Sequence, residues 1–135
     1  MRVVLDSNVI VSALATRGLC FAILDLCIEE HQLILSRDIL EEISAYLENK
    51  AKVPAPIIHN TLSFLKMNSS VLVPQSIRED ACRDPNDLKI LGLAAAAKAD
   101  VIITGDNDLL SLKKFETITI ISPRDFWTRS LKKSP

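Results

Sequence analysis

The sequence predicts one α/β domain over residues 1–135, with helices on both faces of a mostly parallel central sheet. Short continuous apolar runs alternate with longer helical patterns, which is typical of strands that are buried on both faces. The composition is 48% hydrophobic and 24% charged, close to that of ordinary globular domains, and it excludes a disordered chain. A length of 135 residues is sufficient for one hydrophobic core without disulfide or zinc cross-links. We therefore expect a three-layer α/β/α arrangement.

The predicted strands are five short runs rich in Val, Ile and Leu. Because each is apolar throughout, neither face of the sheet is expected to meet solvent. The runs are residues 3–5, 33–35, 71–73, 101–103 and 118–121.

The predicted helices fill the segments between these strands. The last begins near Pro123, where Ser122 is a suitable N-cap and Asp125 occupies the position of a capping-box acid. Four consecutive alanines at residues 94–97 would let one helix approach the sheet closely. The other predicted helices cover about residues 7–15, 19–30, 37–49, 56–67, 86–98 and 107–112.

Charge and cysteine content limit the possible functions and compartments. The formal net charge is −1, which argues against nucleic-acid binding through a bulk positive surface, so any such chemistry must come from a local site. Three cysteines without CxxC spacing indicate reduced thiols. The chain starts without a leader pattern, and its longest apolar stretch is far shorter than the ~20 residues of a membrane span. We expect a soluble cytoplasmic protein.

Acidic residues follow two of the predicted strands. Asp6 comes directly after residues 3–5, and Asp106 comes shortly after residues 101–103. Ligands of open parallel sheets bind outside the carboxyl ends of the strands, so both carboxylates are expected at the same edge. The alternative is helix capping, since aspartate is a favoured N-cap and a helix follows each residue.

A third acidic position lies at the start of the helix predicted from about residue 86. Asp84 precedes Pro85 and is best explained as an N-cap with proline at the first helical position. Asp87 falls in the first turn, where it is either a metal ligand or a favourable partner of the helix dipole. Capping by Asp84 favours Asp87 as the ligand, but the sequence leaves the choice open.

Glu42 is the fourth acidic candidate. It lies at the border of the apolar face of the helix over residues 37–49, whereas Glu41 lies near the opposite pole. A glutamate at such a border is either solvated or directed over the edge of the sheet toward the aspartates.

Several carboxylates gathered in one crevice require a cation. Two of them ~4 Å apart repel by roughly 4 kcal/mol at an effective dielectric constant near 20. Oxygen ligands without histidine or cysteine select a hard ion such as Mg²⁺ or Mn²⁺. Such an ion typically meets a phosphate, which predicts phosphoryl transfer or phosphodiester hydrolysis.

Three segments resemble the motifs of PIN (PilT N-terminus) domain ribonucleases, in the order in which that family has them. They are residues 5–14 (LDSNVIVSAL), 82–87 (CRDPND) and 103–110 (ITGDNDLL). The likeness extends over roughly residues 2–122 and is greatest to the VapC-like toxins of toxin–antitoxin pairs.

The resemblance implies an endoribonuclease that depends on Mg²⁺ or Mn²⁺, a homodimer, and a small antitoxin that blocks the site. It also implies roles for individual residues. The acidic quartet would be Asp6, Glu42, Asp87 and Asp106, with Asp108 as a supporting acid that reaches the metal through water, and with Asn8 and Thr104 holding the site or touching a phosphate.

Two alternatives to a nuclease remain. A PIN-like fold can serve as a non-catalytic module that binds nucleic acid or protein, although such a module is expected to have lost some of the acids. A haloacid-dehalogenase-type phosphatase would use Asp6 as its nucleophile, but it requires a second acid two residues later, where this chain has Asn8.

Overall fold

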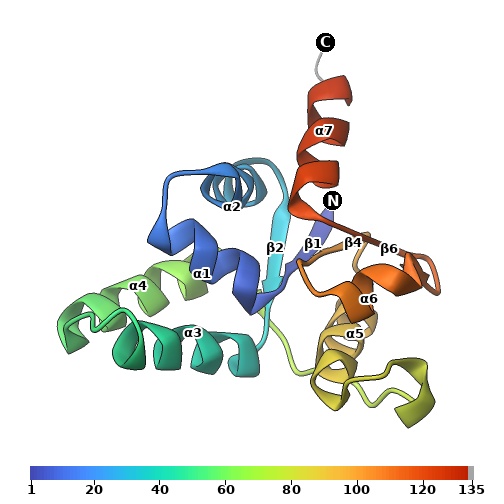
Figure 1. Ribbon diagram of the computed structural model, residues 1–135, viewed down its shortest axis with the longest axis horizontal. Coiled ribbons are helices and arrows are strands. Elements are labelled where there is room, and N and C mark those ends of the chain that lie inside the picture. Colours follow the sequence, from blue (N-terminus) through green and yellow to red (C-terminus); the bar gives the residue numbers. More distant parts are fainter. Residues whose placement is uncertain (134–135) are drawn as a thin grey trace.

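The computed structural model describes residues 1–133 and contains one six-stranded sheet between two layers of helices (Figure 1). The strand order is β3-β2-β1-β4-β6-β5. Every neighbouring pair is parallel except β5 and β6, which are antiparallel. The strands are β1 (Arg2–Leu5), β2 (Gln32–Leu35), β3 (Ser70–Val71), β4 (Val101–Ile103), β5 (Lys114–Phe115) and β6 (Ile118–Ile121).

The direction of the crossovers explains which helices cover which face. From β1 the chain moves outward to β2 and β3, then returns across the sheet to β4 and β6, so right-handed connections change faces at that return. Accordingly, α1 to α4 lie on one side of the sheet and α5 and α6 on the other (Figure 1), which confirms the predicted three-layer fold. The helices are α1 (Ser7–Ala15), α2 (Leu19–Glu30), α3 (Arg37–Asn49), α4 (Ala55–Met67), α5 (Pro85–Ala97), α6 (Asn107–Leu112) and α7 (Pro123–Lys133), with a short 3₁₀ turn, η1 (Glu79–Ala81).

The central strands are buried on both faces. Val4, Ile34 and Ile102 have no exposed surface, which accounts for the continuous apolar runs in the sequence. Cys27 lies in the same core, and its burial raises the pKa of the thiol to about 12, so this cysteine is an inert packing residue. All three cysteines are free thiols, as the sequence predicts.

Helix α5 approaches the sheet closely through its small side chains. Ala94 and Ala97 are buried against β1 and β2, as expected from the run of alanines. Gly92, on the same helix, accepts a backbone hydrogen bond from Gln75 (N to O, 3.1 Å). A Cβ at residue 92 would collide with the carbonyl oxygen of Gln75, so only glycine lets the segment after β3 pack on α5.

The structure corrects the prediction at both edges of the sheet. The strand predicted at 71–73 is shorter and earlier, at Ser70–Val71, because this edge strand pairs only with β2, and Val73 beyond it is 85% exposed. The sequence did not predict β5, which has no apolar run. A tight turn joins this strand to β6, and the two strands are antiparallel. Lys113 before β5 and Glu116 after it both have a positive φ.

No single helix among residues 1–133 is both long enough and apolar enough to cross a membrane; α1 and α2 meet those criteria only as a pair that is bent by 111°.

Candidate metal centre at the carboxyl edge of the sheet

The register of β1 against β4 brings together residues that lie 98 positions apart in the chain. Leu5 is paired with Ile103, so Asp6 and Thr104 follow side by side at the carboxyl edge of the sheet. The Thr104 hydroxyl donates to Oδ2 of Asp6 at 2.8 Å, and its own oxygen, Oγ1, accepts a hydrogen bond from the backbone N–H of Asp106 at 3.0 Å. Thr104 is fully buried, so this hydroxyl fixes the positions of both acids.

Three aspartates form the tightest group of acids at this edge. One carboxylate oxygen each from Asp84, Asp87 and Asp106 lies within 4.8 Å of the other two. Asp87 is buried, with 5% of its surface exposed, while Asp84 and Asp106 are half-buried. The group therefore combines the start of α5 with the loop that follows β4.

Helix capping explains only part of this arrangement. Asp84 accepts from the backbone N–H of Asn86 (3.0 Å) and Asp106 accepts from that of Asp108 (2.8 Å), so both are true N-caps. Each capping bond uses only one of the two oxygens of the carboxylate. Asp6 is the residue before α1, but its side chain makes no capping bond and turns to Thr104 instead. Capping thus explains Asp84 and Asp106 in part, and it does not explain the orientation of Asp6.

Crowding of negative charge changes the acidity of Asp87. Burial raises the pKa of this carboxyl from 3.8 to about 7, helped by a hydrogen bond to the Asp106 side chain and by repulsion from Asp106, Asp84 and Asp6. Cys82 donates its thiol proton to Oδ2 of Asp87 at 3.8 Å, a weak interaction. Without a cation, the protein therefore holds a proton at Asp87 near neutral pH.

Glu42 reaches the same edge from α3. Ser7 donates its hydroxyl to Oε2 of Glu42 at 2.9 Å, and the same hydroxyl lies 3.4 Å from Oδ1 of Asp6. Glu42 is exposed, so it lies on the solvent side of the buried acids. Glu41 instead pairs with Arg37 on the outer surface, as the helical periodicity predicts.

The residues proposed from the sequence thus fall into two linked groups. In the first group, Asp87 and Asp106 lie with Asp84, which the sequence assigned mainly to capping. In the second group, Ser7 joins Asp6 to Glu42. Thr104 connects the two groups, because it is hydrogen-bonded to both Asp6 and Asp106. Asn8 is exposed, and Asp108 contributes its backbone N–H to Asp106. Metal binding by any of these residues stays a prediction.

Three features of the site escaped the sequence analysis. The three-residue spacing of Asp84 and Asp87 was a signal that both carboxylates could share one face of the first helical turn. The bridging role of Ser7 had a weaker signal, a hydroxyl next to Asp6 at the start of a helix. The position of Cys82 beside Asp87 had none.

The donor set fits a hard divalent cation. Apart from the Cys82 thiol beside Asp87, the side chains that converge here offer carboxylate or hydroxyl oxygens, which Mg²⁺ and Mn²⁺ prefer. The ion pairs among the described side chains, those of residues 1–132, involve Glu41, Asp80 and Asp38, so none of these side chains forms an ion pair with the clustered aspartates. A cation would replace the proton held at Asp87 and relieve the repulsion.

Comparisons with known proteins give the family of the chain and a solved structure with a similar fold. A family model described as PIN domain matches residues 2–108. The chain is 36% identical to the uncharacterized protein MJ1680 of Methanocaldococcus jannaschii, over 84% of this chain and 76% of that protein. It also resembles, with a TM-score of 0.63, a chain in the crystal structure of VapBC2 from Rickettsia felis bound to a DNA fragment from their promoter. That match covers 90% of this chain and 98% of the other at 15% identity, and shows a shared fold. Because the PIN domain model matches residues 2–108, which is most of the chain, the chain belongs to the PIN domain family.

Proposed function

We propose that this protein is an endoribonuclease that depends on Mg²⁺ or Mn²⁺ and acts as the toxin of a toxin–antitoxin pair. The observation that carries the proposal is the group of three carboxylates within 4.8 Å of one another at the sheet edge where α/β proteins bind ligands. Such a group is unfavourable unless a cation is bound. Membership of the PIN domain family supports nuclease chemistry at this edge.

Asp87 and Asp106 are the central ligands in this proposal, with Asp84 and Asp6 beside them. Capping bonds and the Thr104 hydroxyl fix these carboxylates before the cation arrives, so binding requires little rearrangement. When bound, the metal supplies a Lewis acid for the phosphodiester group. Without the cation, these carboxylates repel the phosphate backbone of RNA, because like charges repel.

Glu42 has a different role in the proposal, since it is exposed and lies outside the group of three. Its carboxylate is held by Ser7 on the solvent side of the buried acids. From there it can orient an attacking water and accept its proton, a role that requires an acid near, but not buried within, the cation site.

The test is cleavage of a panel of single-stranded and structured RNAs with Mg²⁺, Mn²⁺ or chelator. We expect wild type to cut only with metal and Asp106→Asn to lose at least about 10²-fold in rate, since one preorganised charged group contributes that much. The matched control is Asp25→Asn, the same change at an exposed position on α2, which should cut at the wild-type rate.

Two results would contradict the nuclease. Cleavage that persists in chelator or in Asp106→Asn would come from a contaminant. RNA that is bound by wild type but never cut, with either metal, would favour the non-catalytic binding module instead. A DNA panel run in parallel decides between RNA and DNA as substrate.

The antitoxin in this proposal covers the outer side of α4. The apolar side chains of this helix are divided between two sides: Ile58 and Leu65 are buried in the core, while Ile57 is 53% exposed. Phe64 and Met67 continue the exposed side of the helix at 52% and 84%. An apolar helix side of this kind suits a small protein partner.

A further inference from the structure

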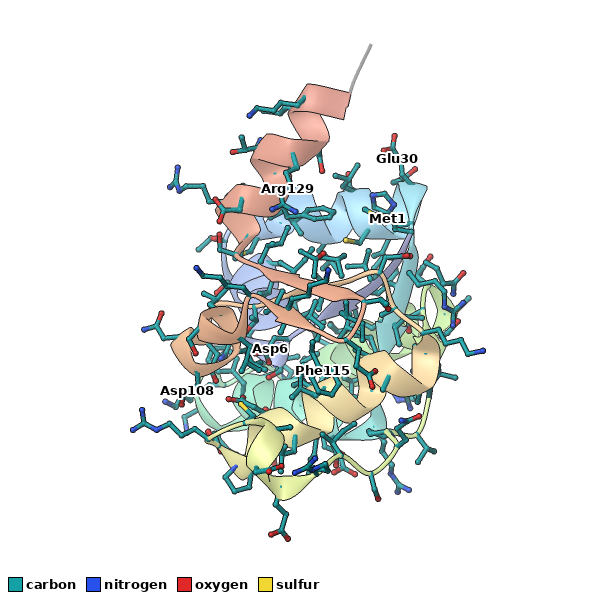
Figure 2. All side chains as sticks on the ribbon, turned by 90° about the vertical axis from the view of Figure 1, so that its right-hand side faces the viewer. Met1, Asp6, Glu30, Asp108, Phe115 and Arg129 are labelled. Atoms are coloured by element: carbon teal, nitrogen blue, oxygen red, sulfur yellow. The ribbon has the colours of Figure 1, made fainter. Side chains whose placement is uncertain are left out.

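A hollow of about 290 Å³ lies between α3 and α5, the helices that carry Glu42 and Asp87. Its third side is the chain that follows β3, which passes between the start of α3 and α5 (Figure 1). Figure 2 shows Asp6 and Asp108 in the lower half of the molecule, together with α5, and Met1 and Glu30 at the opposite end. The hollow is lined by Asp38, residues 74–77, Leu88 and Lys89.

Both helices begin at the carboxyl edge of the sheet, so the hollow lies within one helical turn of the acids. On α5, Leu88 follows Asp84 by four residues. On α3, Asp38 precedes Glu42 by four residues. Positions four apart lie on the same face of a helix, and one turn rises by ~5.4 Å. A nucleotide whose phosphate lies at the acids can therefore reach the hollow with its base.

The walls of the hollow are held in place by the protein itself. The backbone N–H of Gln75 donates to the carbonyl of Gly92 at 3.1 Å, which fixes the chain after β3 on α5. Lys89 forms an ion pair with Asp38 (Nζ to Oδ1, 4.0 Å), which links α5 to α3. A preformed recess loses less conformational freedom on binding than one that must close around its ligand.

The lining combines apolar surface with hydrogen-bonding groups that the fold does not use. Leu88 and Ile77 are half-buried and supply apolar surface. In the part of the chain whose side chains are described, residues 1–132, the Gln75 amide and the Ser76 hydroxyl have no hydrogen-bond partner, and both are exposed. An amide offers a donor and an acceptor side by side, which matches the edge of a nucleobase.

We infer that this hollow, the base recess, receives one unpaired base of the RNA beside the cleaved phosphodiester. Its volume is about twice the ~150 Å³ of a cavity that takes up benzene, which is room for one base but not for a base pair. Leu88 and Ile77 contact the base, while Gln75 and Ser76 read its edge. The inference rests on the proposed nuclease and adds its substrate class: RNA that is single-stranded at this nucleotide, where the base is free to turn out.

Cleavage of a random-sequence RNA pool, followed by sequencing of the new ends, tests the base recess. We expect wild type to favour one base by at least about tenfold at a fixed position next to the cut, since paired contacts to a base edge discriminate by that much. Gln75→Ala should still cut but lose most of this preference, because it keeps the backbone bond to Gly92 and removes only the amide. Asn60→Ala, the loss of an exposed amide on α4 outside the recess, should keep the preference.

An abasic nucleotide measures the same contact without cleavage. The non-cutting variant Asp106→Asn should bind single-stranded RNA at least about tenfold more weakly when the favoured position has no base, a loss typical of removing one base contact. Adding Leu88→Ala should reduce this difference, because the apolar wall of the recess is then missing.

The outcomes separate the base recess from the nuclease. Wild type that cuts without base preference, or that cuts double-stranded RNA as readily as single-stranded RNA, overturns the recess and leaves the nuclease intact. A preference that survives Gln75→Ala, or an abasic loss that survives Leu88→Ala, also overturns it, because the base is then read elsewhere. If no RNA is cut, the proposed nuclease fails and the abasic RNA alone decides: equal binding of both RNAs overturns the recess.

Discussion

Above about pH 7, where Asp87 is ionised, replacing it by asparagine will stabilise the metal-free protein and at the same time remove its stabilisation by Mg²⁺. The side chain keeps its shape and can still accept from Cys82, but it no longer adds a negative charge beside Asp106 and Asp84. Relief of about 1 kcal/mol of repulsion would raise the thermal midpoint by about 3–5 °C in a domain of this size. Wild type, by contrast, should gain about 2.7 kcal/mol when Mg²⁺ is at 100 times its dissociation constant.

The pH dependence of stability gives the same prediction a second readout. The pKa of Asp87 is raised from 3.8 to about 7, so the folded chain holds a proton that the unfolded chain has lost over this interval. The contribution of Asp87 to stability is therefore complete below pH 3.8 and is lost as the pH rises through about 7. In chelator, the Asp87→Asn variant should lack this component, and wild type should bind Mg²⁺ more tightly as the pH rises through the same interval.

Thermal unfolding of both proteins, with chelator and with Mg²⁺ across that pH interval, measures these effects. Asp38→Asn is the matched control: this half-buried acid also lies in the first turn of a helix, at the start of α3, but outside the group. If Asp87→Asn lowers the metal-free midpoint, or still gains stability from Mg²⁺, then the carboxyl of residue 87 is a structural acceptor and not part of a cation site.

Replacing Thr104 by valine will damage both stability and the site, although the two side chains have nearly the same shape. The change removes the donor to Oδ2 of Asp6 and the acceptor of the Asp106 N–H in one step. Because Thr104 is fully buried, each group left without its partner costs about 1–3 kcal/mol. Loss of a residue that orients metal ligands typically lowers metal affinity or activity by about 10–100-fold.

Thr104→Ser is the control, because it keeps the hydroxyl and loses only a methyl group. We expect the serine variant to retain most of the metal affinity and cleavage rate, and the valine variant to lose both together with several degrees of thermal midpoint. Equal losses in the two variants would mean that residue 104 acts through packing and that its hydroxyl does not position the acids.

The sequence was sufficient to place Asp6 and Asp106 at one edge, because the carboxyl ends of parallel strands meet at the same edge of a sheet. The strand order and the register that pairs Leu5 with Ile103 depend on packing between distant segments and were not predicted from the sequence. The helix starts at Asp84 and Asp106 could also be predicted from the sequence, because a capping residue acts on the backbone next to it. Local rules and the periodicity of burial thus account for the fold and for the location of the acids.

Distances between side chains from different elements could not be derived in this way. Asp84 was assigned to capping, and the structure shows that one of its oxygens caps α5 while the carboxylate also lies beside Asp87 and Asp106. A capping rule describes one hydrogen bond and is silent about the second oxygen. The short strand β5 was missed for a similar reason, because its pairing with β6 depends on the tight turn between them and not on an apolar pattern.

The central claim is that the acids of this edge hold one divalent cation together, and a crystal soaked in Mn²⁺ and measured for anomalous scattering tests it most directly. We predict a peak within bonding distance of Asp87 and Asp106, and the same map will show whether Asp84 or Asp6 completes the coordination. The peak should vanish in crystals of Asp87→Asn. A soaked wild-type crystal without a peak at this edge, or with its ion bound elsewhere, would contradict the account.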